Sequence, residues 1–129
     1  MPSEPPRAIL VVDDQADERA IQSAMLGHLG YRVREAADGP SGIAAALDDP
    51  PDLILLDIAM PRMDGFAVSR ALRSDPRAAD VRILFFTASV VTDLEEQARN
   101  AGADGVLVKP VEPRSVAVAV RNLIGPPVG

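Results

Sequence analysis

Short runs of apolar residues alternate along the chain with stretches in which apolar residues recur every three or four positions. The continuous runs AILVV, DLILLD and VRILFFTA are typical of buried strands, and the alternating YRVREA is typical of a strand with one solvated face. Together with GVLVK they predict five strands, over residues 8–12, 31–36, 52–57, 81–88 and 105–109.

The stretches that follow these strands carry apolar residues at helical spacing, which predicts five helices. Asp38 and Asp64 precede the second and third helix and are candidate N-caps. Thr92 and Glu95 form a predicted capping box ahead of the fourth. The apolar positions that carry the helical pattern are, in chain order, Ile21, Met25 and Leu29; Ile43 and Leu47; Val68 and Leu72; Leu94 and Ala98; and Val116, Val120, Leu123 and Ile124.

Strict alternation of strands and helices predicts an α/β fold, a doubly wound parallel sheet covered on both faces. The 129 residues are the size of one domain. We predict that this domain spans residues 7–124, with residues 1–6 and 125–129 as flexible tails or linker remnants, because both ends are proline-rich.

Composition and charge exclude several classes of protein. The chain has no cysteine, which excludes disulfides, thiolate metal sites and cysteine nucleophiles. A net charge of −6 without a basic run argues against direct binding of nucleic acid. No apolar run is long enough to span a membrane, and the N-terminus lacks the hydrophobic region of a secretory signal, so we expect a cytoplasmic protein.

Polar side chains follow four of the predicted strands. Asp13 and Asp14 follow the first strand, Asp57 the third, Thr87 the fourth and Lys109 the fifth. In an open parallel sheet the carboxyl ends of the strands form the ligand-binding rim. Each residue alone has a structural alternative, as a helix cap, a turn former or a solvated lysine. Three carboxylates at one rim repel each other unless a cation neutralises them, and a hard divalent ion such as Mg²⁺ suits them.

This combination of side chains favours aspartyl phosphate chemistry. An ionised carboxylate can attack a phosphoryl group and form an acyl phosphate. Mg²⁺, an ammonium group and a hydroxyl can hold the peripheral oxygens of the transferring group. The chain has no GxxxxGK[ST] loop, no GxGxxG after a strand, no HExxH and no GxSxG.

Four motifs in this order, LVVDD (10–14), LILLDIAMPRMDG (53–65), FTA (86–88) and AGADGVLVKP (101–110), make the chain resemble the receiver domain of two-component response regulators, the CheY-like superfamily. The resemblance implies a flavodoxin-like (βα)5 fold with strand order 2-1-3-4-5. It implies that Asp57 accepts a phosphoryl group from the phosphohistidine of a sensor histidine kinase or a phosphotransfer protein. The protein would be a signalling switch of bacterial type, not an enzyme, and would catalyse only its own phosphotransfer and autodephosphorylation.

The resemblance also implies a metal site. Asp13, Asp14 and Asp57, with the backbone carbonyl of Ala59, would bind Mg²⁺, for which Mn²⁺ could substitute.

Other residues of the resembling motifs would serve the phosphoryl group. Thr87 would hydrogen-bond to it and Lys109 would pair with it, with a cis peptide bond between Lys109 and Pro110. Ala59 and Ser89 would tune the access of water to the acyl phosphate. The family often carries Tyr or Phe at the position of Val106, and valine has no comparable rotation, so we expect a weaker switch or one that acts through backbone shifts.

The resemblance also bears on partners. The one histidine, His28, is expected at the surface near a helix end, so the donor histidine must come from elsewhere. Phe85 and Phe86 are expected in the core. We expect a downstream protein or a fused output domain as a further partner. Val118 points away from the buried face of the last helix, and in receivers the surface of the fourth helix, fifth strand and fifth helix often meets partners or a second copy, so a homodimer through this surface is expected.

Two alternatives remain open. One is a phosphatase or phosphotransferase with an Asp nucleophile, although such enzymes usually carry a second acid two residues later, where this chain has Ala59. The other is an interaction module that works without phosphorylation, which the departure at Val106 keeps open.

Overall fold

The computed structural model describes residues 5–88 and 91–128, and within them strands and helices alternate. The strands are β1 (Ala8–Val12), β2 (Arg32–Ala36), β3 (Leu53–Leu56), β4 (Arg82–Thr87) and β5 (Gly105–Val108). The helices are α1 (Ala16–His28), α2 (Gly39–Asp48), α3 (Gly65–Arg73), α4 (Leu94–Asn100) and α5 (Pro113–Ile124), with a short 3-10 helix, η1 (Pro76–Ala78), before β4. All five predicted strands are confirmed, with ends that differ by at most one residue, and the five predicted helices are confirmed as well.

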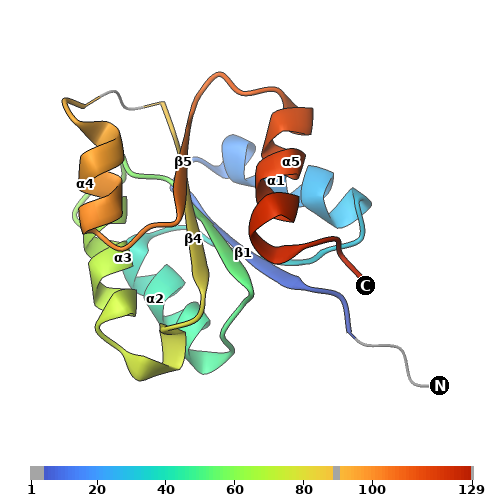
Figure 1. The fold of residues 1–129 in the computed structure, drawn as a ribbon, viewed down its shortest axis with the longest axis horizontal. Coiled ribbons are helices and arrows are strands. Elements are labelled where there is room, and N and C mark those ends of the chain that lie inside the picture. Colours follow the sequence, from blue (N-terminus) through green and yellow to red (C-terminus); the bar gives the residue numbers. More distant parts are fainter. Residues whose placement is uncertain (1–4, 89–90, 129) are drawn as a thin grey trace.

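The strands form one parallel sheet in the order β2-β1-β3-β4-β5, as predicted. Helices α1 and α5 cover one face, and α2, α3 and α4 cover the other (Figure 1). This arrangement is the flavodoxin-like doubly wound fold. Among the described residues, no helix combines the length and the apolar character needed to cross a bilayer.

Successive residues of the central strands enter two separate hydrophobic clusters. Ile9, Val11, Leu53 and Leu55 pack toward α1 and α5, and Leu10, Val12, Ile54 and Leu56 pack toward α2, α3 and α4. The continuous apolar runs in the sequence therefore reflect burial on both faces. The prediction that Phe85 and Phe86 are core residues is confirmed, since they are 0% and 4% exposed. Phe85 meets Phe66 edge to face, with ring centroids 5.4 Å apart.

The buried face of α1 differs from the stripe that carried its helical pattern. Ile21 and Leu29 are 57% and 45% exposed, while Gln22 and Leu26 are buried. Alanines flank the apolar positions, so the sequence defines no narrow stripe, and packing on the sheet decides which side is covered.

Helix caps agree with the sequence for two helices and differ for a third. Asp38 and Asp64 each accept a hydrogen bond from the backbone N–H three residues later, at 2.8 and 2.9 Å, so both predicted N-caps are confirmed. The capping box of Thr92 and Glu95 is wrong. Helix α4 begins one residue later, with Asp93 at its N-cap in a left-handed conformation (φ 57°) and without a side-chain capping bond.

The described part of the C-terminal end lies against the start of β1. The Tyr31 hydroxyl donates to the Gly125 carbonyl at 2.8 Å, and the Arg7 backbone N–H donates to the Pro127 carbonyl at 2.8 Å. The Arg7 guanidinium also donates to the Pro126 carbonyl at 2.6 Å. These residues are therefore hydrogen-bonded to the domain, while the boundaries 7–124 remain a prediction.

Candidate functional site

The parallel register brings the polar strand ends together at one rim of the sheet. Val12 is aligned with Leu56, and Thr87 is aligned with Val108. The hydrogen-bond pattern continues one residue past the strands. Asp57 N–H donates to the Val12 carbonyl at 3.0 Å, and Lys109 N–H donates to the Thr87 carbonyl at 2.8 Å. The backbone of the sheet thus positions both side chains.

Three carboxylates converge at this rim. Asp13, Asp14 and Asp57 each offer one carboxylate oxygen, and these oxygens all lie within 4.8 Å of one another. Asp13 and Asp57 are 3% and 7% exposed. The structure therefore brings together the three acids that the sequence placed at the ends of two different strands.

The hydrogen bonding of these acids suits a bound cation. Asp13 Oδ1 accepts from the Gln15 N–H at 2.9 Å, and Asp57 Oδ1 accepts from the Ala59 N–H at 3.3 Å. Asp14 Oδ1 is buried and has no hydrogen-bond partner among the described residues. A buried carboxylate oxygen without a partner is costly, and a divalent cation with oxygen ligands would satisfy it. The residues present therefore fit Mg²⁺.

The surroundings of Asp57 disfavour its ionised form. Burial raises the pKa of the Asp57 carboxyl above its ordinary value, and the neighbouring Asp13 raises this pKa further. Lys109, a hydrogen bond from the Thr87 side chain and the Ala59 N–H act in the opposite direction on the same pKa. A cation among the three acids would favour the ionised carboxylate that nucleophilic attack requires.

The lysine at the end of β5 points into this group of acids. Lys109 Nζ lies 3.6 Å from Asp13 Oδ2, 3.6 Å from Glu18 Oε2 and 4.8 Å from the centre of the Phe86 ring. The Lys109 side chain is only 16% exposed. Thr87 is fully buried at the end of β4. The peptide bond between Lys109 and Pro110 is cis, as predicted.

Two residues of α1 belong to this neighbourhood and were not recognised in the sequence. Glu18 pairs with Lys109, and the Arg19 guanidinium donates to the Asp13 carbonyl at 2.7 Å and to Glu35 at 3.1 Å. Both lie four to five residues after Asp14, in the first turns of the helix that follows the acids. That spacing was the one available signal, and it is common to many surface helices.

Comparison with known proteins places the chain in a family. The family model for the response regulator receiver domain matches residues 9–121. The chain belongs to this family. Receiver domains are signalling switches of two-component systems and bind Mg²⁺ at an acidic pocket.

The relatives and solved structures agree with this assignment. The chain is 39% identical over 116 residues to the DNA-binding dual master transcriptional regulator RpaA of Synechocystis sp.. The matched region covers 90% of this chain and 48% of RpaA. It is similar to the chemotaxis protein CheY4 of Vibrio cholerae, with a TM-score of 0.86, 31% identity, and coverage of 92% and 98% of the two chains.

A second solved structure is the receiver domain of the sensor histidine kinase PA1611 from Pseudomonas aeruginosa, with a magnesium ion coordinated in its active site cleft. It has a TM-score of 0.85 and 31% identity, and covers 93% and 98% of the two chains. Our chain spans about half the length, or less, of the curated relatives it matches.

In this receiver domain the loop after β3 approaches α3 very closely. A Cβ atom built on Gly65 would lie 2.4 Å from the Asp57 carbonyl oxygen and 2.8 Å from the Ile58 Cα. Gly65 N–H donates to the Ile58 carbonyl at 2.9 Å. Glycine therefore lets the start of α3 pack directly against the backbone that carries Asp57. Ala59, within this loop, is exposed, and its role at the metal remains a prediction.

The departure at the switch position, Val106, and the predicted tuning position Ser89 have different outcomes. Val106 lies on β5 opposite Phe85, is half-buried and packs against the core cluster below α4, so it occupies the strand position expected for it. Its effect on switching remains a prediction. Ser89 lies outside the described residues.

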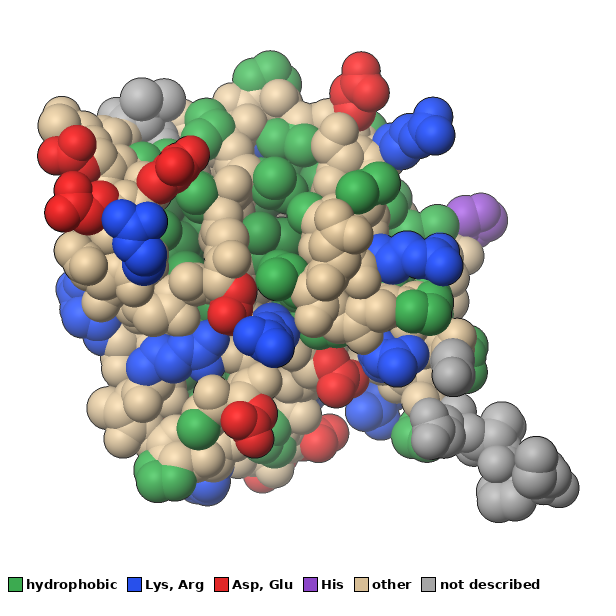
Figure 2. Space-filling view, in the orientation of Figure 1, with side chains coloured by type: hydrophobic (Ala, Val, Ile, Leu, Met, Phe, Trp, Pro, Cys, Tyr) green, Lys and Arg blue, Asp and Glu red, His purple; other side chains and the backbone are tan. Residues whose placement is uncertain are grey.

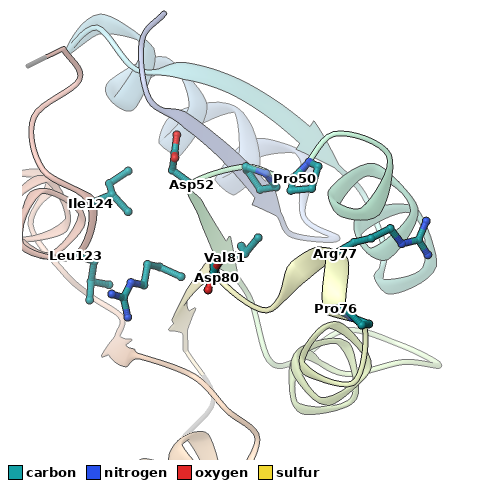
Figure 3. A pocket seen from close by; sticks show the side chains of 10 residues that line it. Pro50, Asp52, Pro76, Arg77, Asp80, Val81, Leu123 and Ile124 are labelled. Carbon is teal, nitrogen blue, oxygen red and sulfur yellow. The ribbon is translucent and has the colours of Figure 1, made fainter. Parts of the chain in front are cut away.

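A hollow of about 410 Å³ lies at the other end of the sheet (Figure 3). Asp52 and Val81, which line it, directly precede β3 and β4, whereas the three acids follow the carboxyl ends of β1 and β3. Leu123 and Ile124 at the end of α5 complete its wall. This hollow is therefore separate from the receiver site, and none of the three clustered acids, Thr87 or Lys109 lines it.

Proposed function

We propose that this receiver domain is phosphorylated on Asp57 by the phosphohistidine of a sensor histidine kinase or a phosphotransfer protein. An oxygen of the Asp57 carboxylate bonds to phosphorus while the phosphorus–nitrogen bond of the donor breaks. The imidazole leaves with the electron pair of that bond. The resulting aspartyl phosphate changes the contacts of the domain with its partners.

The metal site and the phosphoryl site share their residues in this proposal. Asp13, Asp14, Asp57 and the Ala59 carbonyl would hold Mg²⁺, or Mn²⁺ in its place. When bound, the ion supplies positive charge that neutralises the phosphoryl oxygens. On the protein side, Thr87 hydrogen-bonds to the phosphoryl group, and the small side chain of Ala59 leaves room for hydrolytic water. Ser89 is proposed to tune this access as well.

Lys109 provides the cationic side chain that pairs with the phosphoryl group. It is held among acids at the rim and is nearly buried, so its charge acts at short range and with little screening.

One observation carries the proposal: three carboxylates from two strands meet within 4.8 Å, and one of their oxygens is buried without a partner among the described residues. A helix cap or a surface acid needs no such convergence. Phosphatases with an Asp nucleophile usually carry a second acid two residues after it, and this chain has Ala59 there. We therefore propose a signalling switch and not a phosphatase.

The test is incubation of the protein with Mg²⁺ and acetyl phosphate, followed by intact mass measurement. We expect the gain of one phosphoryl group that is stable in acid and labile in base. Asp57→Ala should abolish the gain, because the nucleophile is absent. Lys109→Ala should strongly reduce the change in partner contacts that follows phosphorylation, while it lowers the stability of the fold only slightly.

Asp64→Asn is the matched control, since it changes an acid of the same loop while asparagine can still cap α3. This variant should be phosphorylated like the parent. A parent protein that gains no phosphoryl group from several donors would exclude the switch and favour an interaction module that works without phosphorylation.

We also propose that the receiver, at residues 7–124, acts in the cytoplasm and contacts a downstream protein, a fused output domain or a second copy of itself. The surface of α4, β5 and α5 supports the last of these. Val108 and Val118 are 41% and 51% exposed there. Figure 2 shows hydrophobic side chains between the two helices, with mostly acidic side chains beside α4 and mostly basic ones beside α5. Helix α4 carries Glu95 and Glu96 in its first turn and Arg99 in its last, and α5 follows Glu112 and carries Arg121 in its last turn.

This charge pattern suits a two-fold dimer in which α4 of each copy faces α5 of the other. Sedimentation of the phosphorylated protein should show self-association that Val118→Asp weakens. Equal association of the parent and the Val118→Asp variant would count against this surface.

A further inference from the structure

Glu18 is an acid of α1 that reaches the lysine of the receiver site. Its Oε2 lies 3.6 Å from Lys109 Nζ, the same distance that separates Lys109 from Asp13. The Glu18 side chain is 41% exposed, whereas that of Asp13 is 5% exposed. Glu18 thus adds a negative charge at the edge of the site without belonging to the cluster of three acids.

The position of Glu18 at the start of a helix does not explain this contact. Acids in the first turn are favourable because they face the positive end of the helix dipole. Asp17 lies in the same turn and satisfies the same preference. Among the described residues, only Glu18 of these two forms an ion pair with Lys109. The pair therefore depends on the packing of α1 beside the end of β5.

We propose that Glu18 is a positioning residue that competes with the phosphoryl group on Asp57 for Lys109. The proposal rests on the function proposed above. A lysine ammonium donates three hydrogen bonds from one compact charge. When the phosphoryl group adds negative charge beside Asp57, movement of the Lys109 ammonium toward the new oxyanion weakens its pair with Glu18. The negative charge of the Glu18 carboxylate also repels that oxyanion.

Glu18 therefore favours the unphosphorylated state and sets a threshold for activation. It also connects α1 to the lysine at the end of β5, so displacement of Lys109 releases a contact between these two elements. Removal of the Glu18 charge should shift the equilibrium toward the phosphorylated state.

The test compares the parent with Glu18→Gln and with Asp17→Asn, the control in the same helical turn. Glutamine preserves the length and helix propensity of glutamate and removes its charge. The first measurement is binding of beryllofluoride, a non-covalent phosphoryl mimic, in Mg²⁺ by calorimetry. The second is the ratio of phosphorylated to unphosphorylated protein at limiting acetyl phosphate.

Glu18→Gln should bind beryllofluoride about two- to fivefold more tightly and raise the phosphorylated ratio similarly, the range of a partly exposed ion pair. The gain should shrink at about 1 M salt, where screening acts over about 3 Å. Mg²⁺ affinity should stay unchanged, and the urea midpoint should fall slightly, by no more than the loss of one partly exposed ion pair. A purely structural role of Glu18 would lower the urea midpoint without tightening the binding of beryllofluoride.

Equal behaviour of Glu18→Gln and the parent, weaker binding by Glu18→Gln, or an equal gain in Asp17→Asn would each overturn the role of Glu18 and leave the proposed function intact. A parent that neither binds beryllofluoride nor gains a phosphoryl group would instead overturn the proposed function, and this inference with it.

Discussion

At the scale of single residues, Asp57 is an acid placed where its charge is unfavourable. It is 7% exposed, and burial raises the pKa of its carboxyl, with Asp13 adding to the effect. A buried charge lowers the stability of the folded protein. Such charges are therefore found mainly at functional sites, where the function requires them. Lys109 offsets part of this cost but is itself shared with Glu18.

The raised pKa predicts how stability depends on pH. Between the ordinary value of 3.8 and the raised value, the folded protein binds this proton more tightly than the unfolded chain does. The contribution of the Asp57 carboxyl to the free energy of unfolding therefore falls as pH rises through that window, and it stays lower above the window. In EDTA at pH 7, Asp57→Asn should be more stable than the parent in urea denaturation, because asparagine avoids the buried charge.

That advantage should disappear below pH 3.8, where Asp57 is protonated in both states. Asp48→Asn, at an exposed position at the end of α2, is the control and should change the free energy of unfolding by at most about 0.5 kcal/mol. An Asp57→Asn variant that is no more stable than the parent at pH 7 would contradict the account of burial.

At the scale of elements, the junction between β3 and α3 determines where Asp57 points. The sheet fixes Asp57 N–H on the Val12 carbonyl, and the Asp64 cap fixes the start of α3. Gly65 lets the two elements approach until there is no room for a side chain. The sequence motif MDG thus combines a cap with a close contact.

Gly65→Ala should destabilise the protein by about 1–3 kcal/mol, the usual range for overpacking, because its Cβ would meet rigid backbone at 2.4 Å. It should also reduce phosphorylation of Asp57, since the loop must shift. Gly27→Ala is the matched control, because no atom lies within 4 Å of a Cβ there.

Gly27 lies inside α1, so alanine should stabilise the helix by about 0.5–1 kcal/mol. Urea denaturation and the phosphorylation assay measure both variants. Equal stability of Gly65→Ala and the parent would show that the junction is more adaptable than the packing indicates.

At the scale of the whole molecule, one sheet separates two hydrophobic clusters and carries the cluster of three acids, Asp13, Asp14 and Asp57, at one end. The hollow beside Leu123 and Ile124 lies at the opposite end. A ligand that holds the ends of β1 and β3 together therefore stabilises the entire fold and not a single loop.

Mg²⁺ should stabilise the folded protein by about 2.7 kcal/mol at a concentration of 100 times its Kd. Asp14→Asn should lose most of this stabilisation, because the buried Oδ1 of Asp14 is the oxygen without a partner among the described residues. Asp80→Asn, at the far end of the sheet, should retain it. Urea denaturation with Mg²⁺ and with EDTA measures the difference, and an Asp14→Asn variant with the full response would contradict the metal site.

Apolar periodicity and strand-end acids are local signals, so the elements, the parallel sheet and the residues at its rim could be predicted from the sequence. Asp57, Thr87 and Lys109 could be located from such signals alone. The tertiary structure decided which face of α1 is buried, where α4 begins and which acids meet Lys109. These depend on how helices pack against a twisted sheet, and the ion pair of Glu18 with Lys109 joins segments that no local pattern connects.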